Sequence, residues 1–307
     1  MKLGVMMAMP GDTTGTSGLI ERAQRAERAG FSAAWLPQVF GLDALTVLAL
    51  AGRETNRIEL GTAVVPTYPR HPAVLAGQAL TVQDASGGRL ALGIGLSHRF
   101  VIEDVLGLDY SQPIPHMREY LTVLSGLLTG EPVKFDGEHY KVAAQVSVPG
   151  AAKPPVLVAA LGPAMLKLCG RLADGTVTWA GGLDYLRDTA VPAIRAAAAT
   201  AGRPAPRIVA MVPVAITRDA DGARQAANTI YQGYSQIPSY RATLDRGGAA
   251  GLGDVAIVGT EEEVEKQLRD FSAAGVTDLN AVLFPAPGSD SEGTFEFLGA
   301  LSRQGLA

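Results

Sequence analysis

Short apolar segments alternate with longer segments of helical periodicity along almost the whole chain. At the start, the apolar run 2–7 precedes a segment beginning at Ser17, in which apolar residues recur every three or four positions up to Gly30. This pattern predicts a strand followed by an amphipathic helix. Further strands are predicted at 33–36, 58–65, 90–94, 156–160, 176–179, 208–216 and 279–284.

The helices between these strands have recognisable ends. Asp43 and Thr260 are N-cap residue types, and His71-Pro72 places a proline in a first helical turn. One helix must accommodate Pro192. Helices are predicted from Asp43, from His71 to Ser86, and at 117–128, 164–173, 185–199, 222–231 and 260–275, with a last one ending near 301.

Eight strands, each followed by a helix, predict an α/β protein with a single (β/α)8 TIM barrel over residues 1–307. Residues 133–142 alternate about an Asp-Gly turn, which predicts a hairpin insertion after strand 4. Residues 219–259 form a longer insertion after strand 7. A doubly wound sheet with a second domain is the alternative, but the composition shows no break that would mark a boundary.

Composition narrows the class of protein. With 47% hydrophobic residues in 307, the chain can bury a large core. A net charge of -4 argues against nucleic acid as a partner, and no apolar run is long enough for a membrane span. The single cysteine, Cys169, cannot form an intramolecular disulfide and falls inside a predicted helix as a core residue. We therefore expect a cytoplasmic protein that acts on a small molecule.

A barrel of this kind places its chemistry at the carboxyl ends of the strands. The residues at these ends are mostly small, amide-bearing or apolar, without clustered metal ligands, paired carboxylates or a Schiff-base lysine. Such a mouth suits a planar cofactor that brings its own reactivity, and no metal is expected. Gly93-x-Gly95 is not a dinucleotide fingerprint, because His98 replaces the third glycine and no helix opens there. These glycines indicate a close approach of the backbone to a ligand or to a neighbouring strand.

Several short segments stand in a fixed order along the chain: AERAGF (26–31), IELGTAVV (58–65), RHP (70–72), SGGRLALGIG (86–95), LGPA (161–164), ADG (173–175), GT (259–260) and AGV (274–276). With these segments the chain resembles, over nearly its whole length, the luciferase-like family of flavin and deazaflavin oxidoreductases. The sequences of residues 93–98 and 116–121 are most similar to the coenzyme F420-dependent branch of that family.

The resemblance implies a barrel that binds coenzyme F420, with FMN as the alternative, at the strand ends. It also implies a bulge or a non-prolyl cis bond near Ala63-Val64, and contact between the cofactor phosphate and the turn 161–164, where helix amides attract anions. Arg70, Arg99 and Lys167 are candidates to neutralise the phosphate and tail. The implied cofactor-binding residues are Met7, Thr62, Ala63, Val64, Val65, Gly95, Leu96, Ser97, Ala160, Leu161, Gly162, Pro163, Ala164 and Trp179.

The implied reaction is hydride transfer between the deazaflavin C5 and an organic substrate, with a protein group completing the proton balance. His98 and Gln38 are the catalytic candidates. Gln38 stands where many members of the family have a carboxylate and a histidine, and an amide cannot act as a general acid, which favours a reductase. The alternatives are an FMN-dependent monooxygenase and a cofactor-binding barrel without catalysis.

Other residues receive simpler interpretations. His71 is expected to cap the helix that follows it, and His116 and His139 are expected at the surface. Trp179 and Phe40 are candidates to wall the substrate side. Tyrosines 231, 234 and 240 in the long insertion are candidates for a lid. The resemblance also allows a homodimer.

Overall fold

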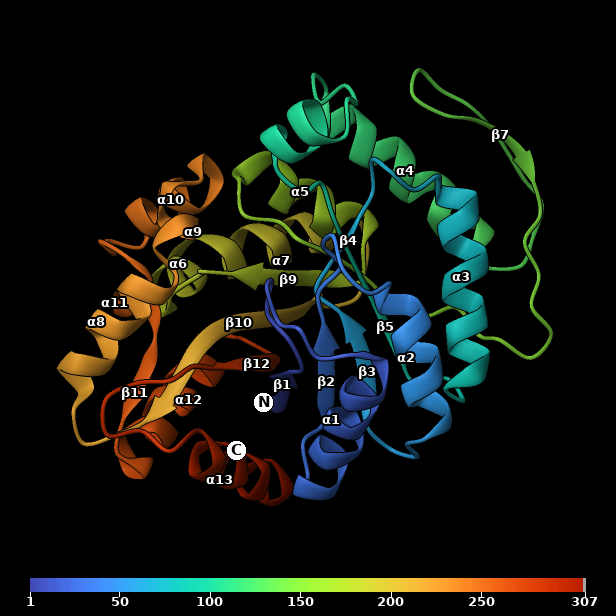
Figure 1. The fold of residues 1–307 in the computed structure, drawn as a ribbon. Helices are drawn as coiled ribbons and strands as arrows, with labels where there is room; N and C mark the ends of the chain where they lie inside the picture. The colour runs from blue at the N-terminus through green and yellow to red at the C-terminus, as the bar shows by residue number, and fades with distance from the viewer. Residues whose placement is uncertain (306–307) are drawn as a thin grey trace.

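Eight parallel strands close into a barrel in the computed structural model, which describes residues 1–305 (Figure 1). Strand β9 pairs with β10 and thereby joins the two ends of the sheet. The predicted (β/α)8 barrel is confirmed. Its strands are β1 (Lys2–Met6), β2 (Ala33–Leu36), β3 (Glu59–Thr62), β5 (Leu90–Gly95), β8 (Val156–Val158), β9 (Gly175–Trp179), β10 (Arg207–Ile216) and β12 (Asp278–Leu283).

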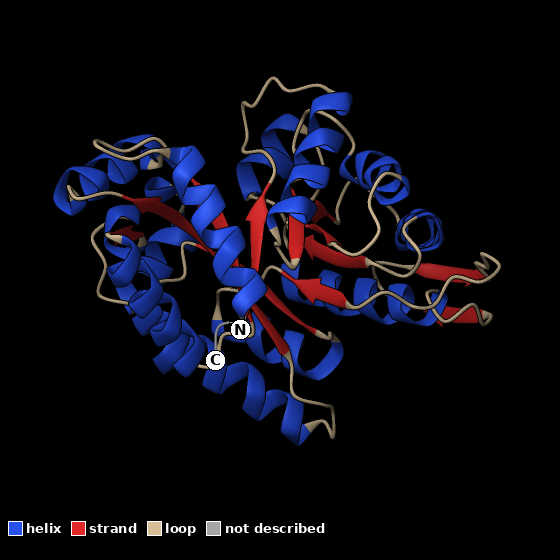
Figure 2. Cartoon of the chain, turned by 90° about the horizontal axis from the view of Figure 1, so that it is seen from below, coloured by secondary structure: helices blue, strands red, loops and turns tan. Residues whose placement is uncertain are grey.

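Helices surround the barrel on its outside (Figure 2). The predicted caps form: Asp43 accepts from the Thr46 amide at 2.8 Å, and His71 Nδ1 accepts from the Ala73 amide at 3.2 Å. No helix of the described residues is both long and apolar enough to cross a bilayer. The helices that follow the strands are α1 (Thr16–Ala29), α2 (Ala44–Arg53), α3 (Pro72–Ala85), α4 (Pro113–Leu127), α5 (Pro163–Leu172), α7 (Val191–Thr200), α12 (Glu261–Ala273) and α13 (Ser291–Gln304).

Two predicted elements are divided in the structure. The strand predicted at 58–65 stops at Thr62 and resumes as β4 (Val65–Pro66), because the Ala63-Val64 peptide bond is cis. The predicted helix 185–199 consists of α6 (Leu183–Tyr185), the π-helical turn η2 (Leu186–Ala190) and α7. Pro192 thus lies in the first turn of α7, directly after the π-helical turn η2.

Both insertions are present. The hairpin of β6 (Val133–Asp136) and β7 (Lys141–Ala144) is antiparallel and lies at the periphery (Figure 1). A second π-helical turn, η1 (Val101–Val105), follows β5. The long insertion holds more structure than the one predicted helix. It contains α8 (Ala220–Ile230), α9 (Gln232–Gln236), α10 (Pro238–Arg246), α11 (Leu252–Val255) and β11 (Ile257–Gly259), a short strand that pairs with β10.

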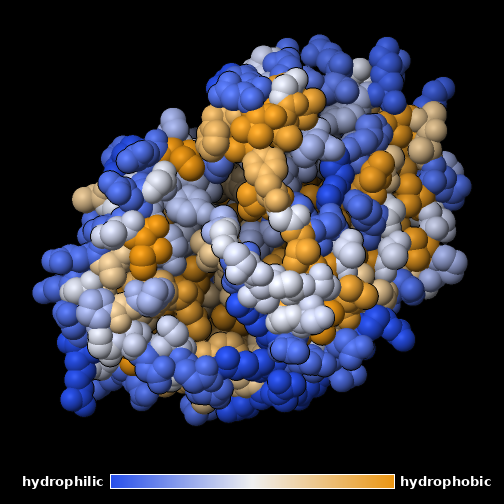
Figure 3. Space-filling model, in the orientation of Figure 1, coloured by the Kyte–Doolittle hydropathy of each residue, from blue (hydrophilic) through white to orange (hydrophobic). Residues whose placement is uncertain are grey.

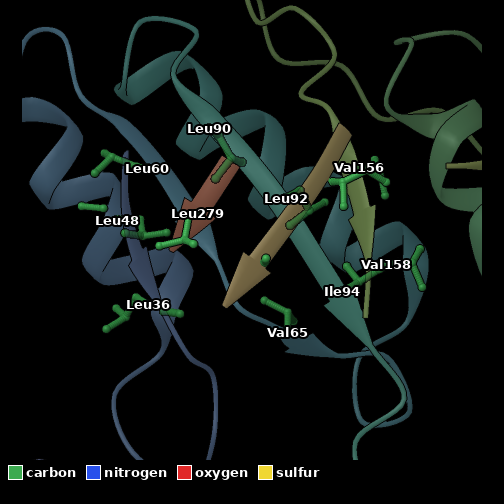
Figure 4. Packing of buried hydrophobic residues seen from close by; sticks show 14 of the residues in the cluster. Leu36, Leu48, Leu60, Val65, Leu90, Leu92, Ile94, Val156, Val158 and Leu279 are labelled. Carbon is green, nitrogen blue, oxygen red and sulfur yellow. The ribbon is translucent and has the colours of Figure 1, made fainter. Parts of the chain in front are cut away.

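Alternate residues of each strand pack outward and inward. Outward residues such as Leu60, Leu92 and Ile94 form the core between strands and helices (Figure 4). Inside the barrel, Trp35 is 1% exposed, and glycines on neighbouring strands make room for its ring. A Cβ on Gly61 would lie 2.1 Å from Trp35 Cε3. The inside is therefore filled by side chains and is not a channel.

A charged network lies inside the barrel where the strands begin. The Arg207 guanidinium donates to Glu59 at 2.5 and 2.9 Å and to Asp278 at 2.5 and 2.9 Å. Asp278 is 5% exposed, so its charge depends on this pairing. This end of the barrel is closed by ion pairs, which leaves the opposite end for a ligand.

Candidate active site

The carboxyl ends of β1, β3 and β9 bring apolar side chains together at the mouth of the barrel. Met6 and Ala63 pack against a cluster that contains Trp179 and Met211. Val64 packs on the inner cluster around Trp35. Ala63, Val64 and Trp179 therefore lie where the resemblance placed them.

Strand alternation corrects three of the expected side-chain positions. Met7, Val65 and Ala160 are buried in the outer core between strands and helices. Because successive residues of a strand point to opposite faces, the mouth receives Met6 in place of Met7. Ala159 replaces Ala160 in the same way, since it lies next to the inward position of Gly95.

Glycines let β5 pass close to the cis peptide segment. A Cβ on Gly93 would lie 2.0 Å from the Thr62 carbonyl oxygen, and one on Gly95 would lie 2.7 Å from Val64 Cγ2. The Thr62 hydroxyl donates to the Gly93 carbonyl at 2.7 Å and accepts from its amide at 2.8 Å. Thr62 is 0% exposed, so it braces the two strands and does not present its hydroxyl to a ligand.

Two residues after strand ends hold a left-handed backbone. Ser97 has φ 62° beyond β5, and Ala180 has φ 61° beyond β9. For residues with a side chain this conformation costs about 1–2 kcal/mol. Such strain concentrates at functional sites, where the surrounding structure enforces it. Both strand ends therefore have the backbone character of a ligand site.

Unpartnered polar atoms are buried near the same end. Trp179 Nε1 has no hydrogen-bond partner in the described chain, although Trp179 is only 6% exposed. Both amide atoms of Asn280 on β12 are also unpartnered, at 0% exposure. Asn280 pairs in register with Gly4, whose side faces Trp35, so the amide points into the barrel. Unpaired buried groups of this kind are costly, and a bound ligand can satisfy those at the mouth.

His98 follows Ser97 and is half-buried. Its ring meets the Tyr240 ring edge-on, with centroids 5.4 Å apart at 67°, and lies parallel to Phe100 at 6.0 Å. Burial lowers the pKa of His98 below its usual 6.5, so the imidazole is mostly neutral at pH 7. Neither ring nitrogen has a hydrogen-bond partner in the part of the chain that the structure describes, which leaves both free for proton exchange.

Both polar atoms of the Gln38 side chain have partners within the chain. Its Oε1 accepts from the Ala44 amide at 2.7 Å, and its Nε2 donates to the Val39 carbonyl at 3.3 Å. The amide thus satisfies the start of α2, and a catalytic role for Gln38 stays a prediction. Phe40, a candidate wall residue, is 65% exposed and is not part of the mouth cluster.

The turn before α5 presents free backbone amides. Gly162 is the N-cap of this helix without a side-chain cap, and Pro163 and Ala164 are exposed. The Tyr185 hydroxyl donates to the Leu161 carbonyl at 2.5 Å and fixes the turn. This geometry is compatible with the phosphate contact that the resemblance implies.

The candidate cations for the phosphate are less favourable. Arg70 is paired with Asp43 at 2.7 Å, and Arg99 with Glu103 at 2.6 Å. Lys167 is exposed on α5. Lys167, the unpartnered Arg70 Nη1 and the backbone amides of Gly162 and Ala164 are thus the groups that remain for an anion.

One histidine prediction was wrong. His116 is 5% exposed, stacked on Tyr68 at 3.9 Å, and accepts or donates at 3.0 Å with the Thr67 hydroxyl. Burial and the neighbouring His139 lower the pKa of His116 to about 4. The residue lines a cavity of about 220 Å³ beside α4, together with Tyr140. A histidine on the buried face of an amphipathic helix gives little signal in sequence, whereas His139 is exposed as expected.

The tyrosines of the long insertion reach the mouth. Tyr231 and Tyr234 each meet Trp179 edge-on with centroids 5.4 Å apart. Tyr240 contacts both Tyr234, at 5.6 Å, and His98. Cys169 is buried in the core, as predicted, and its thiol donates to the Gly175 carbonyl at 2.9 Å.

The barrel, with left-handed residues and unpartnered polar atoms near its mouth, defines a (β/α)8 protein with a candidate ligand site at the strand ends. The family model for luciferase-like monooxygenase matches residues 1–278. The chain belongs to the luciferase-like monooxygenase family.

Relatives of known name match along most of their length. The chain is 30% identical to 5,10-methylenetetrahydromethanopterin reductase of Methanolobus tindarius over 270 residues, covering 83% of this chain and 82% of the relative. It is 29% identical to F420-dependent glucose-6-phosphate dehydrogenase of Mycolicibacterium fortuitum, covering 89% and 88%. The solved coenzyme F420 dependent tetrahydromethanopterin reductase from Methanopyrus kandleri superposes with a TM-score of 0.81 at 26% identity and covers 97% of each chain.

Proposed function

We propose that this protein is a coenzyme F420-dependent oxidoreductase that acts as a reductase on a small organic molecule. The observation that carries the proposal is the similarity to the Methanopyrus kandleri reductase over 97% of both chains. The chain's own mouth fits a planar group, because Trp179 Nε1 is buried and unpartnered beside apolar side chains. When bound, the deazaflavin supplies the hydride-carrying carbon.

The residues that would hold the cofactor follow from the geometry. Met6, Ala63 and Val64 form an apolar surface for the ring, and the backbone of Gly95, Leu96 and Ser97 borders it. The backbone amides of Gly162 and Ala164 are placed for the phosphate. Trp179 Nε1 supplies a hydrogen-bond donor at the ring edge.

His98 is the group proposed to exchange the proton. It is half-buried at the mouth, and its ring nitrogens are not occupied by other groups of the described chain. Because burial lowers its pKa, protonation of His98 favours reduction in mildly acidic solution, and the neutral form favours the reverse direction.

The cofactor proposal is tested by titrating purified protein with oxidised F420 and following the cofactor fluorescence. We expect saturable binding in the micromolar range, about tenfold weaker in Ala63→Leu, whose longer side chain enters the ring surface. The matched control Ala193→Leu lies in α7, at a partly buried position outside the mouth. Saturable binding of FMN without binding of F420 would instead identify the flavin enzyme.

We also propose that the protein is a cytoplasmic homodimer. Support for the dimer comes from large apolar side chains exposed around α2 and α3: Phe40 at 65%, Val74 at 56% and Leu50 at 44%. Orange areas cover this part of the surface in Figure 3. Sedimentation velocity should give a dimer that Val74→Glu converts to a monomer, because the charge would be buried in the interface.

A further inference from the structure

A continuous row of aromatic rings crosses the mouth of the barrel, from β9 to the segment after β5. We call it the aromatic wall: Trp179, Tyr231, Tyr234, Tyr240, His98 and Phe100. Neighbouring rings along it have centroids 5.4 to 6.4 Å apart, and most meet edge-on. The wall joins the long insertion to the strand ends, so a ligand that reaches the mouth contacts rings from both.

The approach to this wall is apolar as well. Phe100 is 52% exposed, and Val105 and Leu106 on or beside η1 are 58% and 36% exposed. Figure 3 shows an apolar patch above the central hollow of the molecule, at the place of η1. The apolar surface of a molecule that enters past η1 is therefore removed from water along the whole path, which favours its entry.

Cations on the segments that carry the wall are engaged elsewhere. Arg99 pairs with Glu103 at 2.6 Å, and Arg187 pairs with Asp184 and Asp188 at 2.7 Å. Arg241 pairs with Asp245 at 2.8 Å and donates to the carbonyls of 249 and 250 at 2.7 Å. An anion at the wall would lose its hydration without gaining a cationic partner.

The adjacent cavity does not correct this lack of positive charge. A cavity of about 280 Å³ is lined by the loop after β9 and by α8, α10 and α11. Its lining contains Arg224 as a cation and two carboxylates, Asp184 and Asp254. Arg224 donates to the Gly253 carbonyl at 3.2 Å. Because Arg224 is engaged in this way, the lining of the cavity offers an anionic group no free cation.

From the aromatic wall and the engaged cations, we propose that the substrate is an uncharged, mainly apolar molecule with a planar unsaturated group, and that carboxylates and phosphate esters are excluded. The inference rests on the proposed reductase function, because it concerns the substrate side of the same site. Aromatic faces bind planar apolar groups with large contact area, and buried rings lose little conformational entropy on binding. The class is thus distinct from the sugar phosphate named in one relative.

The test uses two probes that share one skeleton and differ in charge, (E)-cinnamamide and (E)-cinnamate. The chain has two tryptophans, Trp35 inside the barrel and Trp179 in the wall, so tryptophan fluorescence excited at long wavelength reports on the mouth. We expect cinnamamide to change the fluorescence saturably, with a Kd at least about tenfold lower than that of cinnamate. Trp179→Phe should abolish most of the change.

Variants of Tyr240 separate ring packing from other effects. Tyr240→Phe should keep cinnamamide affinity within about twofold, and Tyr240→Ala should weaken it by about fivefold or more, because only the alanine removes the ring. Phe135→Leu in the hairpin strand β6 is the control and should bind as the wild type does. Correct folding of each variant is checked by its thermal transition.

The outcomes distinguish this inference from the cofactor proposal. Equal or tighter binding of cinnamate, or no saturable cinnamamide binding up to its solubility limit, overturns the neutral-substrate inference. Absence of F420 binding, with charge discrimination retained, overturns the cofactor proposal alone. Binding of both, followed by turnover of cinnamate in preference to cinnamamide, overturns the inference while leaving the reductase function in place.

Discussion

Gly93 is the position where a single added methyl group should disturb the barrel most directly. A Cβ there would lie 2.0 Å from the Thr62 carbonyl oxygen and 3.1 Å from its carbon. Both atoms belong to the backbone, so no side-chain rotation can relieve the contact. Gly93→Ala must therefore push β5 away from β3 and stretch the two hydrogen bonds of the Thr62 hydroxyl.

The magnitude follows from the overpacking cost of a rigid site. An added methyl group in a close-packed core costs about 1–3 kcal/mol, and a backbone clash belongs at the upper end. For 307 residues the unfolding entropy is about 0.6 kcal/mol/K, so 3 kcal/mol corresponds to a fall of about 5 °C in Tm. Because β5 lies against Val64, which is proposed to border the cofactor ring, F420 binding should weaken in the same variant.

Differential scanning calorimetry of two glycine-to-alanine variants tests this reasoning. Gly77 lies inside α3, and the nearest atom to its added Cβ is Val146 Cγ1 at 3.9 Å. Gly77→Ala should raise Tm slightly, because alanine favours a helix by about 0.5–1 kcal/mol over glycine. If Gly93→Ala melts at or above the wild-type temperature, the close approach of β5 to β3 is not the constraint that we infer.

Three further predictions concern charge and reactivity. Arg207→Met should lower the free energy of unfolding in urea by about 3–5 kcal/mol, because Glu59 and Asp278 lose their partner inside the barrel. The control Arg203→Met, whose pair with Asp174 is about one-third exposed, should cost under about 1 kcal/mol, and equal effects of the two variants would contradict this reasoning. With His98 as the proton donor, kcat/KM for reduction should fall as pH rises through a pKa below 6.5. His98→Gln should remove this pH dependence without weakening F420 binding, and an unchanged pH profile in this variant would exclude His98 as the proton donor. Burial raises the pKa of the Cys169 thiol to about 12, so a disulfide reagent at pH 8 should modify this thiol only at the rate of unfolding. Rapid modification of the native protein would show that the thiol is accessible in the folded state.

The barrel was predictable because each strand and helix carries its own local signal. Apolar runs bounded by caps such as Asp43 and His71 give the order of elements, and eight strand–helix units without a break in composition favour a barrel over an open sheet. The long insertion was less predictable. Helices α9 and α10 are short. At the mouth, Tyr234 of α9 contacts Trp179, and Tyr240 of α10 contacts His98. Contacts of this type leave no periodic pattern in the sequence.

The errors at the site have one physical origin. A strand reverses the face of its side chains at every residue, so an uncertainty of one residue exchanges Met6 for Met7 at the mouth. The same reversal separates Ala159 from Ala160. Gln38 is a different case: the sequence shows an amide after β2, but not that the start of α2 uses its oxygen.

Asn280 had a signal in the sequence that was not used. It is a polar residue within an otherwise apolar strand, and strand parity places it on the same face as Gly4 and Met211. A polar side chain at an inward position of a barrel strand is costly without a partner, so its presence marks a functional position. A polar residue at a strand position that faces the inside of the barrel is thus a better criterion for this site than a residue at a strand end alone.

The charge state of the mouth follows from the same burial that shapes it. Burial raises the pKa of Tyr231, Tyr234 and Tyr240, so these hydroxyls stay protonated and neutral well above pH 7. Burial lowers the pKa of His98, which keeps the imidazole mostly neutral at the same pH. The titratable groups of the aromatic wall therefore all favour their uncharged forms. A site of this kind gains its selectivity from shape and desolvation, and in the proposed reduction a protonated His98 would give its proton to the negative charge that develops on the substrate.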